Sequence, residues 1–344
     1  MPLRPLYGHE AIRRRLAQAV RLERLPQTLL FEGPKGVGKQ RLALWLAQAL
    51  LCEATKAGEP CGSCRPCRLV TTLTHPDLHW FIPLEPSKKH ADADKQVDLV
   101  EAALGEEMAA RREQPLYVPP SGMAAHTIAA VRLLLRRISL SPAIGQRKVF
   151  IIGDAERLIP QPSSPEAANA LLKALEEPPA SAVFVLTAAD ADALLPTILS
   201  RVVRMKVPRV SDSVVTSFVQ NELPEHRSAD RIVPTAQGSI GRVLALKGVP
   251  DRPEPSERWL AAGQQGGVER YATALRQAPF QARGGFTDML DGLLDRLRRE
   301  ARVAEDPGRL VEAIALVLEA REQAQGNVNP QLLAAVLADD LAVR

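Results

Sequence analysis

The chain has 344 residues, of which 46% are hydrophobic and 24% charged, and its formal net charge is +4. This length predicts two or three domains, and the composition is typical of a globular protein with a buried core. No apolar run reaches the ~18 residues of a membrane span, and the N-terminus has no apolar signal core, so we expect a cytoplasmic protein without a membrane partner. The mild basic excess permits a nucleic-acid partner but does not require one.

Helices and strands alternate through the first 208 residues. Apolar spacing predicts helices at 10–25, 39–52, 127–142, 164–179 and 191–202. Apolar runs predict strands at 28–33, 75–84, 148–158, 182–190 and 203–208. This alternation predicts a parallel sheet with helices on both faces. Ligands bind at the carboxyl ends of such strands, where we expect the loop after residue 33, Asp154 and Thr187.

The remainder of the chain is helical or irregular. Residues 86–120 are rich in Lys, Asp, Glu and Ala and are bounded by prolines, which predicts an exposed insertion, partly helical and partly disordered. Residues 209–250 form a small helical unit, residues 251–257 read as a linker, and residues 258–344 contain several helices.

The stretch "FEGPKGVGKQ" at 31–40 matches a phosphate-binding loop in every position but the last. Gly33, Gly36 and Gly38 allow backbone N–H groups to face a phosphate, and Lys39 would reach the β- and γ-phosphates. The expected strand before the loop and helix after it support the match. The pattern requires Ser or Thr next, for Mg²⁺, and this chain has Gln40.

A second Mg²⁺ ligand is also displaced. In "VFIIGDAERL" an acidic residue should follow the apolar strand directly, but Gly153 stands there and Asp154 comes one place later. Losing electrostatic stabilisation at the phosphoryl centre raises the barrier by several kcal/mol. We therefore expect a site defective in hydrolysis; a working site with shifted ligands is the alternative.

All four cysteines lie between residues 52 and 67: Cys52, Cys61, Cys64 and Cys67. Four thiolates at this spacing suit a tetrahedral structural Zn²⁺ site. An iron–sulfur cluster also takes four cysteines and remains an alternative. A further feature, Ser200–Arg201, lies at the end of an expected helix, where an arginine usually compensates the helix dipole.

Several stretches together closely resemble the bacterial clamp loader subunits of DNA polymerase III. They are the cysteine module and the sequences "LPQTLLFEGPKGVGK" (25–39), "HPD" (75–77) and "EAANALLKALEEPPASAVFVLTAADADALLPTILSR" (166–201), with a weaker match at "QGSIGRVLAL" (237–246). Such loaders are AAA+ pentamers that open a ring-shaped sliding clamp and place it on primer–template DNA. The resemblance implies an α/β P-loop AAA+ domain, a helical lid and a helical collar.

Within this family the sequence is most similar to the delta-prime type, which usually has a damaged ATP site, rather than to the hydrolysing gamma/tau type. Gamma/tau would need Ser or Thr at 40 and Asp-Glu at 153–154. It would also have Thr-Thr where this chain has Ala188–Ala189, and Arg242 lies one place beyond the expected second sensor. The resemblance implies no ATPase of its own, and it leaves open whether the P-loop binds nucleotide passively.

The resemblance also implies specific roles and partners. Arg201, with Ser200, would act as an arginine finger on ATP held by a neighbouring subunit, although Val202 replaces the family's cysteine. The implied domains are an AAA+ domain at 1–208 with a zinc module at 52–67, a lid at 209–250 and a collar at 258–344. The implied partners are gamma/tau and delta subunits, the clamp and, through the complex, DNA at replication forks, as part of the polymerase holoenzyme. A gamma/tau-like ATPase and a zinc-containing DNA-binding module are the rival readings.

Overall fold

The structure is a computed structural model that describes residues 3–85, 92–114, 124–158, 165–223, 229–246, 256, 259, 267–276, 286–324 and 328–342. The chain divides into two compact units, one extending to residue 248 and the other following it. Each unit has its own apolar core. The described part of the chain contains no helix that is both long and apolar enough to cross a membrane.

The first unit is built on a five-stranded sheet with the order β2-β3-β4-β1-β5. Its strands are β1 (Thr28–Glu32), β2 (Leu78–Phe81), β3 (Lys148–Ile152), β4 (Ala182–Ala188) and β5 (Val203–Lys206). Every neighbouring pair is parallel, as the alternation of helices and strands predicted. The central strands β3 and β4 are buried along their whole length, which matches their continuous apolar sequences.

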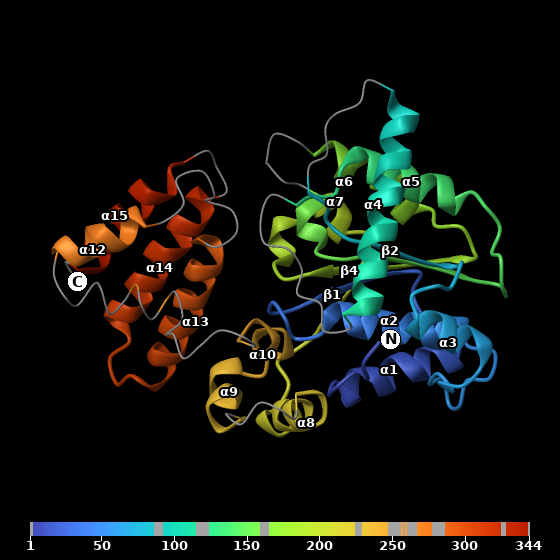
Figure 1. The fold of residues 1–344 in the computed structure, drawn as a ribbon, viewed down its shortest axis with the longest axis horizontal. Helices are drawn as coiled ribbons and strands as arrows, with labels where there is room; N and C mark the ends of the chain where they lie inside the picture. The colour runs from blue at the N-terminus through green and yellow to red at the C-terminus, as the bar shows by residue number, and fades with distance from the viewer. Residues whose placement is uncertain are drawn as a thin grey trace. The chain divides into compact units, whose positions relative to one another are not determined.

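Helices cover both faces of this sheet (Figure 1). One face carries α1 (Glu10–Arg21), α2 (Lys39–Leu51) and α3 (Arg65–Thr71), and the other carries α5 (Ile128–Ile138), α6 (Glu166–Glu176) and α7 (Pro196–Leu199). Two short 3₁₀ helices, η1 (Ala155–Leu158) and η2 (Ala191–Ala193), follow β3 and β4. The expected helix at 191–202 is therefore two short helical turns, because the chain is extended at Leu194 before Pro196.

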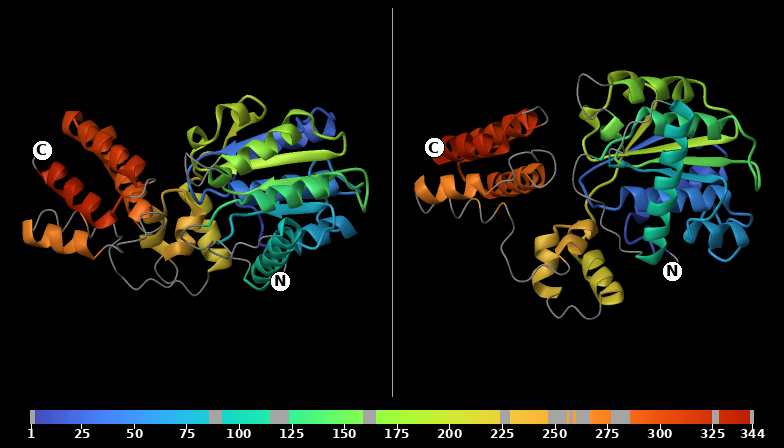
Figure 2. Two further views of the ribbon diagram at one scale, coloured as in Figure 1. Left: turned by 90° about the horizontal axis from the view of Figure 1, so that it is seen from above. Right: turned by 45° about the horizontal axis from the view of Figure 1, so that its top comes forward.

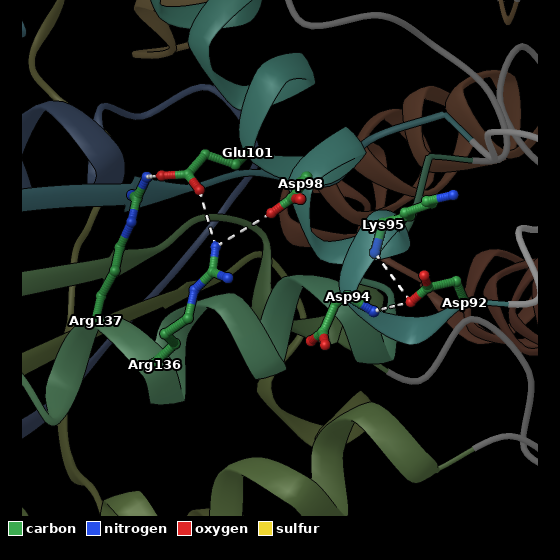
Figure 3. A network of polar contacts seen from close by, with 7 residues as sticks. All are labelled: Asp92, Asp94, Lys95, Asp98, Glu101, Arg136 and Arg137. Carbon is green, nitrogen blue, oxygen red and sulfur yellow. Dashed lines mark hydrogen bonds and ion pairs between the residues drawn. The ribbon is translucent and has the colours of Figure 1, made fainter.

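The expected insertion at 86–120 contains one long helix, α4 (Ala93–Glu113). Its N-terminus is capped by Asp92, whose carboxylate accepts from the backbone N–H groups of Asp94 and Lys95 (Figure 3). Val97, Val100 and Leu104 are buried in the core of the unit. The segment is thus not exposed along its whole length, since one face of α4 packs on the domain. Residues 86–91 and 115–120 lie outside the described residues.

Ion pairs join α4 to α5 on the solvent side of this packing (Figure 3). Glu101 accepts from Arg137 at 2.7 Å and from Arg136 at 3.0 Å. Asp98 pairs with Arg136 at 3.5 Å. Arginine also fixes α4 over the edge strand, where the Arg111 guanidinium lies 4.5 Å from the ring centre of Trp80 in β2.

Three short helices complete the first unit: α8 (Asp212–Glu222), α9 (Ala229–Ala236) and α10 (Ile240–Leu246). We call them the lid helices; they share a separate apolar cluster around Val215, Phe218 and Val243. Tyr7, from the chain before α1, packs edge-on against Phe218 and donates to the Glu222 carboxylate at 2.8 Å. The N-terminal segment therefore ties the lid helices to the sheet domain.

The described part of the second unit is helical, with α12 (Gly267–Leu275), α13 (Thr287–Val303), α14 (Gly308–Gln323) and α15 (Pro330–Ala342) (Figure 2). Its core contains Trp259, Phe286, Leu290, Leu293, Val317 and Leu337. Several apolar side chains of α12 and α15 remain exposed: Val268, Tyr271, Leu275, Leu332 and Val336.

Candidate functional site: a closed phosphate loop, a four-thiol cluster and a surface arginine

The P-loop lies at the carboxyl edge of the sheet, between β1 and α2. Because β1, β3 and β4 are neighbours, the ends of these strands bring distant residues together. Gly33 donates its N–H to the carbonyl of Ala188, and Asp154 donates its N–H to the Thr187 hydroxyl at 3.1 Å. The expected meeting of the P-loop, Asp154 and Thr187 is confirmed.

Lys39 is turned back onto its own loop. Its ammonium donates to the carbonyls of Gly33 at 2.7 Å and Pro34 at 2.9 Å. The residue is only 5% exposed, and burial lowers the pKa of its amine, while Glu156 and Asp154 oppose that change. A phosphate would therefore have to displace contacts that the lysine already makes within the chain.

Gln40 and Gly153 occupy one space. A Cβ built on Gly153 would lie 2.9 Å from Cδ, Nε2 and Oε1 of Gln40. A side chain at position 153 would require the Gln40 amide, the end of a flexible side chain, to move aside, so the two departures from the P-loop pattern lie in contact with each other. The amide of Gln40 fills the place beside β3 where an acidic side chain at 153 would begin.

A lid helix contacts the phosphate loop directly. Gly241 in α10 donates its N–H to the carbonyl of Gly36 at 2.8 Å, and the Ser239 hydroxyl donates to the carbonyl of Lys35 at 3.1 Å. A Cβ on Gly241 would lie 2.6 Å from the Cα of Gly36, so only glycine permits this approach. The start of α10 is therefore packed against the loop.

Glu156 in η1 is a further acid at this site, and the sequence reasoning did not identify it. Its Oε1 accepts from the N–H of Ala189 at 3.1 Å, and its Oε2 is shielded from solvent without a hydrogen-bond partner among the described residues. Burial, and then the charge of Asp154, raise the pKa of Glu156 to about 7. Glu156 is therefore only partly ionised at neutral pH, and its ionised form offsets the Lys39 charge that a phosphate would otherwise use.

The proximity of Gln40 to Gly153 yields a stability prediction. Gly153→Ala should destabilise the full chain by about 0.5–1 kcal/mol, because the Gln40 amide must leave its preferred position to admit the methyl. In a Gln40→Ser background the same change should be neutral, or stabilising by roughly 0.4–1 kcal/mol, because Gly153 has an ordinary backbone conformation that alanine can adopt.

The measurement is a double-mutant cycle in which calorimetry gives the melting temperature of each variant. A control cycle pairs Gly153→Ala with Gln48→Ser, since Gln48 lies further along α2 and bonds to the Cys67 carbonyl. Additive effects of Gly153→Ala and Gln40→Ser would contradict the shared space.

The four cysteines form a compact cluster. Their sulfur atoms all lie within 4.8 Å of one another, with 3.8 Å from Cys52 to Cys64 and 3.9 Å from Cys61 to Cys67. These separations exclude disulfides, whose sulfurs lie ~2.05 Å apart. They match the ~3.8 Å edge of a tetrahedron with metal–sulfur bonds of ~2.3 Å. The cluster could therefore hold a metal ion.

Backbone groups also support thiolates at this cluster. The N–H groups of Ala54 and Cys61 donate to the Cys52 sulfur, that of Cys64 to the Cys61 sulfur, and that of Cys67 to the Cys64 sulfur. Such bonds, the one from Cys64 being the largest, lower the pKa of Cys61 to about 6, whereas burial raises the pKa of Cys52 and of Cys67. Metal binding requires the thiolate form, which these donors favour.

Arg201 lies away from the P-loop, between α7 and β5. Its side chain is 29% exposed. It borders a shallow, open depression of about 540 Å³ that is also lined by Gln27, Thr28, Leu175, Glu176, Pro178 and Ser200. The Thr28 hydroxyl holds the backbone carbonyl of Arg201 at 2.7 Å. The structure thus presents a fixed backbone and a partly exposed guanidinium at the chain's surface.

The fold and the degenerate loop define an α/β protein of the P-loop class, with a five-stranded parallel sheet flanked by helices. The model of the family described as DNA polymerase III, delta subunit, matches residues 8–211. The chain belongs to this family, which confirms the resemblance to bacterial clamp loader subunits.

Relatives of two subunit types are similar to this chain. DNA polymerase III subunit delta' of Pseudomonas aeruginosa is 31% identical over 57% of this chain and 47% of its own length. Subunit delta' of Bacillus subtilis is 33% identical over 54% of this chain and 43% of its own length. Subunit tau of Escherichia coli is 29% identical over 70% of this chain and 31% of its own length. The chain thus matches half or less of the length of these curated relatives.

A solved structure is also similar: a DNA polymerase III gamma subunit-related protein of Thermotoga maritima. It covers 96% of this chain and 99% of its own, with 17% identity and a TM-score of 0.47.

Proposed function

We propose that this chain is a delta-prime-type subunit of a DNA polymerase III clamp loader. On this proposal it does not hydrolyse ATP and supplies Arg201 to ATP bound by a neighbouring subunit. The observation that carries the proposal is the pairing of Gln40 with Gly153, which puts an amide where a metal-binding pair would stand. Phosphoryl transfer in P-loop proteins needs Mg²⁺ held by a hydroxyl and a carboxylate, and this loop offers neither at those two positions.

The contacts around the loop support the same proposal. Lys39 is engaged by its own loop, and α10 is hydrogen-bonded to Gly36 and Lys35. Binding a nucleotide would require these contacts to break and would add phosphate charge near Glu156 and Asp154. We therefore propose that the loop stabilises the domain and does not bind ATP at working concentrations.

We further propose Zn²⁺ as the occupant of the cysteine cluster. Four sulfurs within 4.8 Å of one another suit zinc, which would hold the 52–67 segment in place without taking part in a reaction. The segment packs on α1, since a Cβ on Gly58 would lie 1.9 Å from the carbonyl of Ala17. The alternative, an iron–sulfur cluster, can be distinguished from zinc by the colour of the protein and by its metal content.

The proposed partners are gamma/tau and delta subunits, the sliding clamp and, through the complex, primer–template DNA at the replication fork in the cytoplasm. The lid at 209–250 and the collar at 258–344 belong to this proposal. The exposed apolar side chains on α12 and α15 support it, because a helical collar that holds a pentamer needs an apolar face outside its own core.

Assays of the isolated chain and of a loader reconstituted with it test the function. We expect no ATP turnover by the isolated chain and no tight, salt-dependent DNA binding by it. Added to gamma/tau-type and delta-type subunits, the chain should produce ATPase that clamp and primer–template DNA stimulate. Turnover by the isolated chain would favour the gamma/tau-like reading, and tight DNA binding by it would favour the zinc DNA-binding module.

A further inference from the structure

The side chain of Arg201 is held by its own chain, and one partner is an acid that sequence reasoning did not single out. Nη1 donates to the carbonyl of Thr197 at 2.9 Å and to the Ser200 hydroxyl at 3.2 Å. Nη2 donates to Oε1 of Glu176 at 3.1 Å. Nε is shielded from solvent and has no partner among the described residues.

The N–H groups of the Arg201 guanidinium that could bind a phosphate can be counted. A guanidinium carries five, in a fixed fork. Both hydrogens of Nη1 and one of Nη2 are directed to groups of this chain, and the Nε hydrogen is shielded. One N–H of Nη2 is left, whereas phosphate is best bound by two parallel N–H groups. The guanidinium must therefore give up an internal bond before it can bind phosphate in a bidentate manner.

Glu176 is the partner that can be released most easily. Its side chain is 56% exposed, and it is the last residue of α6. A carboxylate is disfavoured at a helix C-terminus, where the dipole is negative. Because the carboxylate is exposed, water can replace its hydrogen bond with Arg201. A carboxylate beside the fork would also repel an approaching phosphate.

We propose that Glu176 is a positioning residue that holds the Arg201 guanidinium in a withdrawn orientation until a neighbouring phosphate displaces it. This inference rests on the proposed function of Arg201. The ion pair delays engagement of the finger, so that the approach of the neighbour's γ-phosphate, and not assembly alone, completes the catalytic arrangement.

The test uses the complete loader, reconstituted with gamma/tau-type and delta-type subunits. Glu176→Gln preserves shape and removes the charge. ATPase in the absence of clamp and DNA should rise about two- to fivefold, the effect expected of an exposed ion pair. The rise should be in kcat, with KM for ATP unchanged, because the finger acts on the transition state. Glu177→Gln is the matched control, since it removes an exposed charge one residue away, whereas the carboxylate that accepts from Arg201 is that of Glu176.

A second arm separates this inference from the proposed function. In an Arg201→Ala loader, Glu176→Gln should have no effect, because Glu176 acts through the guanidinium. An unchanged or lower kcat in the Glu176→Gln loader overturns the withdrawn orientation, and so does an increase that persists without Arg201. If Arg201→Ala alone leaves ATPase unchanged, the finger role itself is wrong.

Discussion

Replacing Arg201 with alanine is expected to abolish rapid ATP hydrolysis at the neighbouring site of the assembled loader. An arginine that stabilises charge on the transferring phosphoryl group is worth about 10³–10⁵ in rate. The loader should lose the share of ATP turnover that this interface contributes, while its other ATP sites continue to hydrolyse ATP. The measurement is single-turnover hydrolysis with clamp and primer–template DNA, in which the phase from the served site should vanish.

Two controls accompany this prediction. Arg15→Ala removes the same charge from an exposed position on α1 and should leave both assembly and hydrolysis unchanged. Arg201→Lys keeps a charge but loses the planar fork, so it should recover only part of the rate. Because Arg201 also bonds to the carbonyl of Thr197, pentamer assembly must be checked by size. Normal hydrolysis in a correctly assembled Arg201→Ala loader would refute the finger role.

Replacing Cys67 with serine is expected to lower metal affinity by more than about 100-fold, since the loss of an outer-shell partner alone costs 10–100-fold. Cys67 is fully buried and belongs to α3, so the vacant position cannot be filled readily from solvent. Bound metal per chain, measured after dialysis against a competing chelator, should fall from one zinc to nearly none. The melting temperature should fall with it, because metal binding contributes to folding.

The comparison variant is Ser63→Ala, whose hydroxyl lies 3.8 Å from the Cys61 sulfur. It changes a group beside a ligand and should reduce affinity by ~10-fold or less. A colourless protein with one zinc supports the proposed occupant. A brown protein containing iron and sulfide would show that the cluster is iron–sulfur instead.

Features defined by neighbouring residues were predictable from the sequence. The P-loop and the cysteine cluster each lie within a short stretch, so spacing alone fixes which groups face one ligand. The alternation of strand and helix predicted the parallel sheet, because a parallel connection needs a crossover. The family was predictable for the same reason, since its motifs are short and contiguous.

Relations between distant residues were not predictable in the same way. Gln40 and Gly153 each departed from a pattern, but their shared space exists only because α2 packs against the end of β3. The buried acid Glu156 was missed, since its burial depends on the strand order around β4. The face of α4 that packs on the domain was missed because its sequence is highly charged, and its three buried residues, Val97, Val100 and Leu104, are spread over two turns.

The sequence by itself therefore determined the parallel sheet, the family and the cysteine cluster, because local patterns specify these features. The tertiary structure decided how the P-loop is closed and how Arg201 is held. Lys39 bonds to its own loop, α10 lies against Gly36, and Glu176 at the end of α6 meets Arg201 at the end of α7. The last two contacts join elements that are separate along the chain, and packing of the folded domain brings them within hydrogen-bond distance.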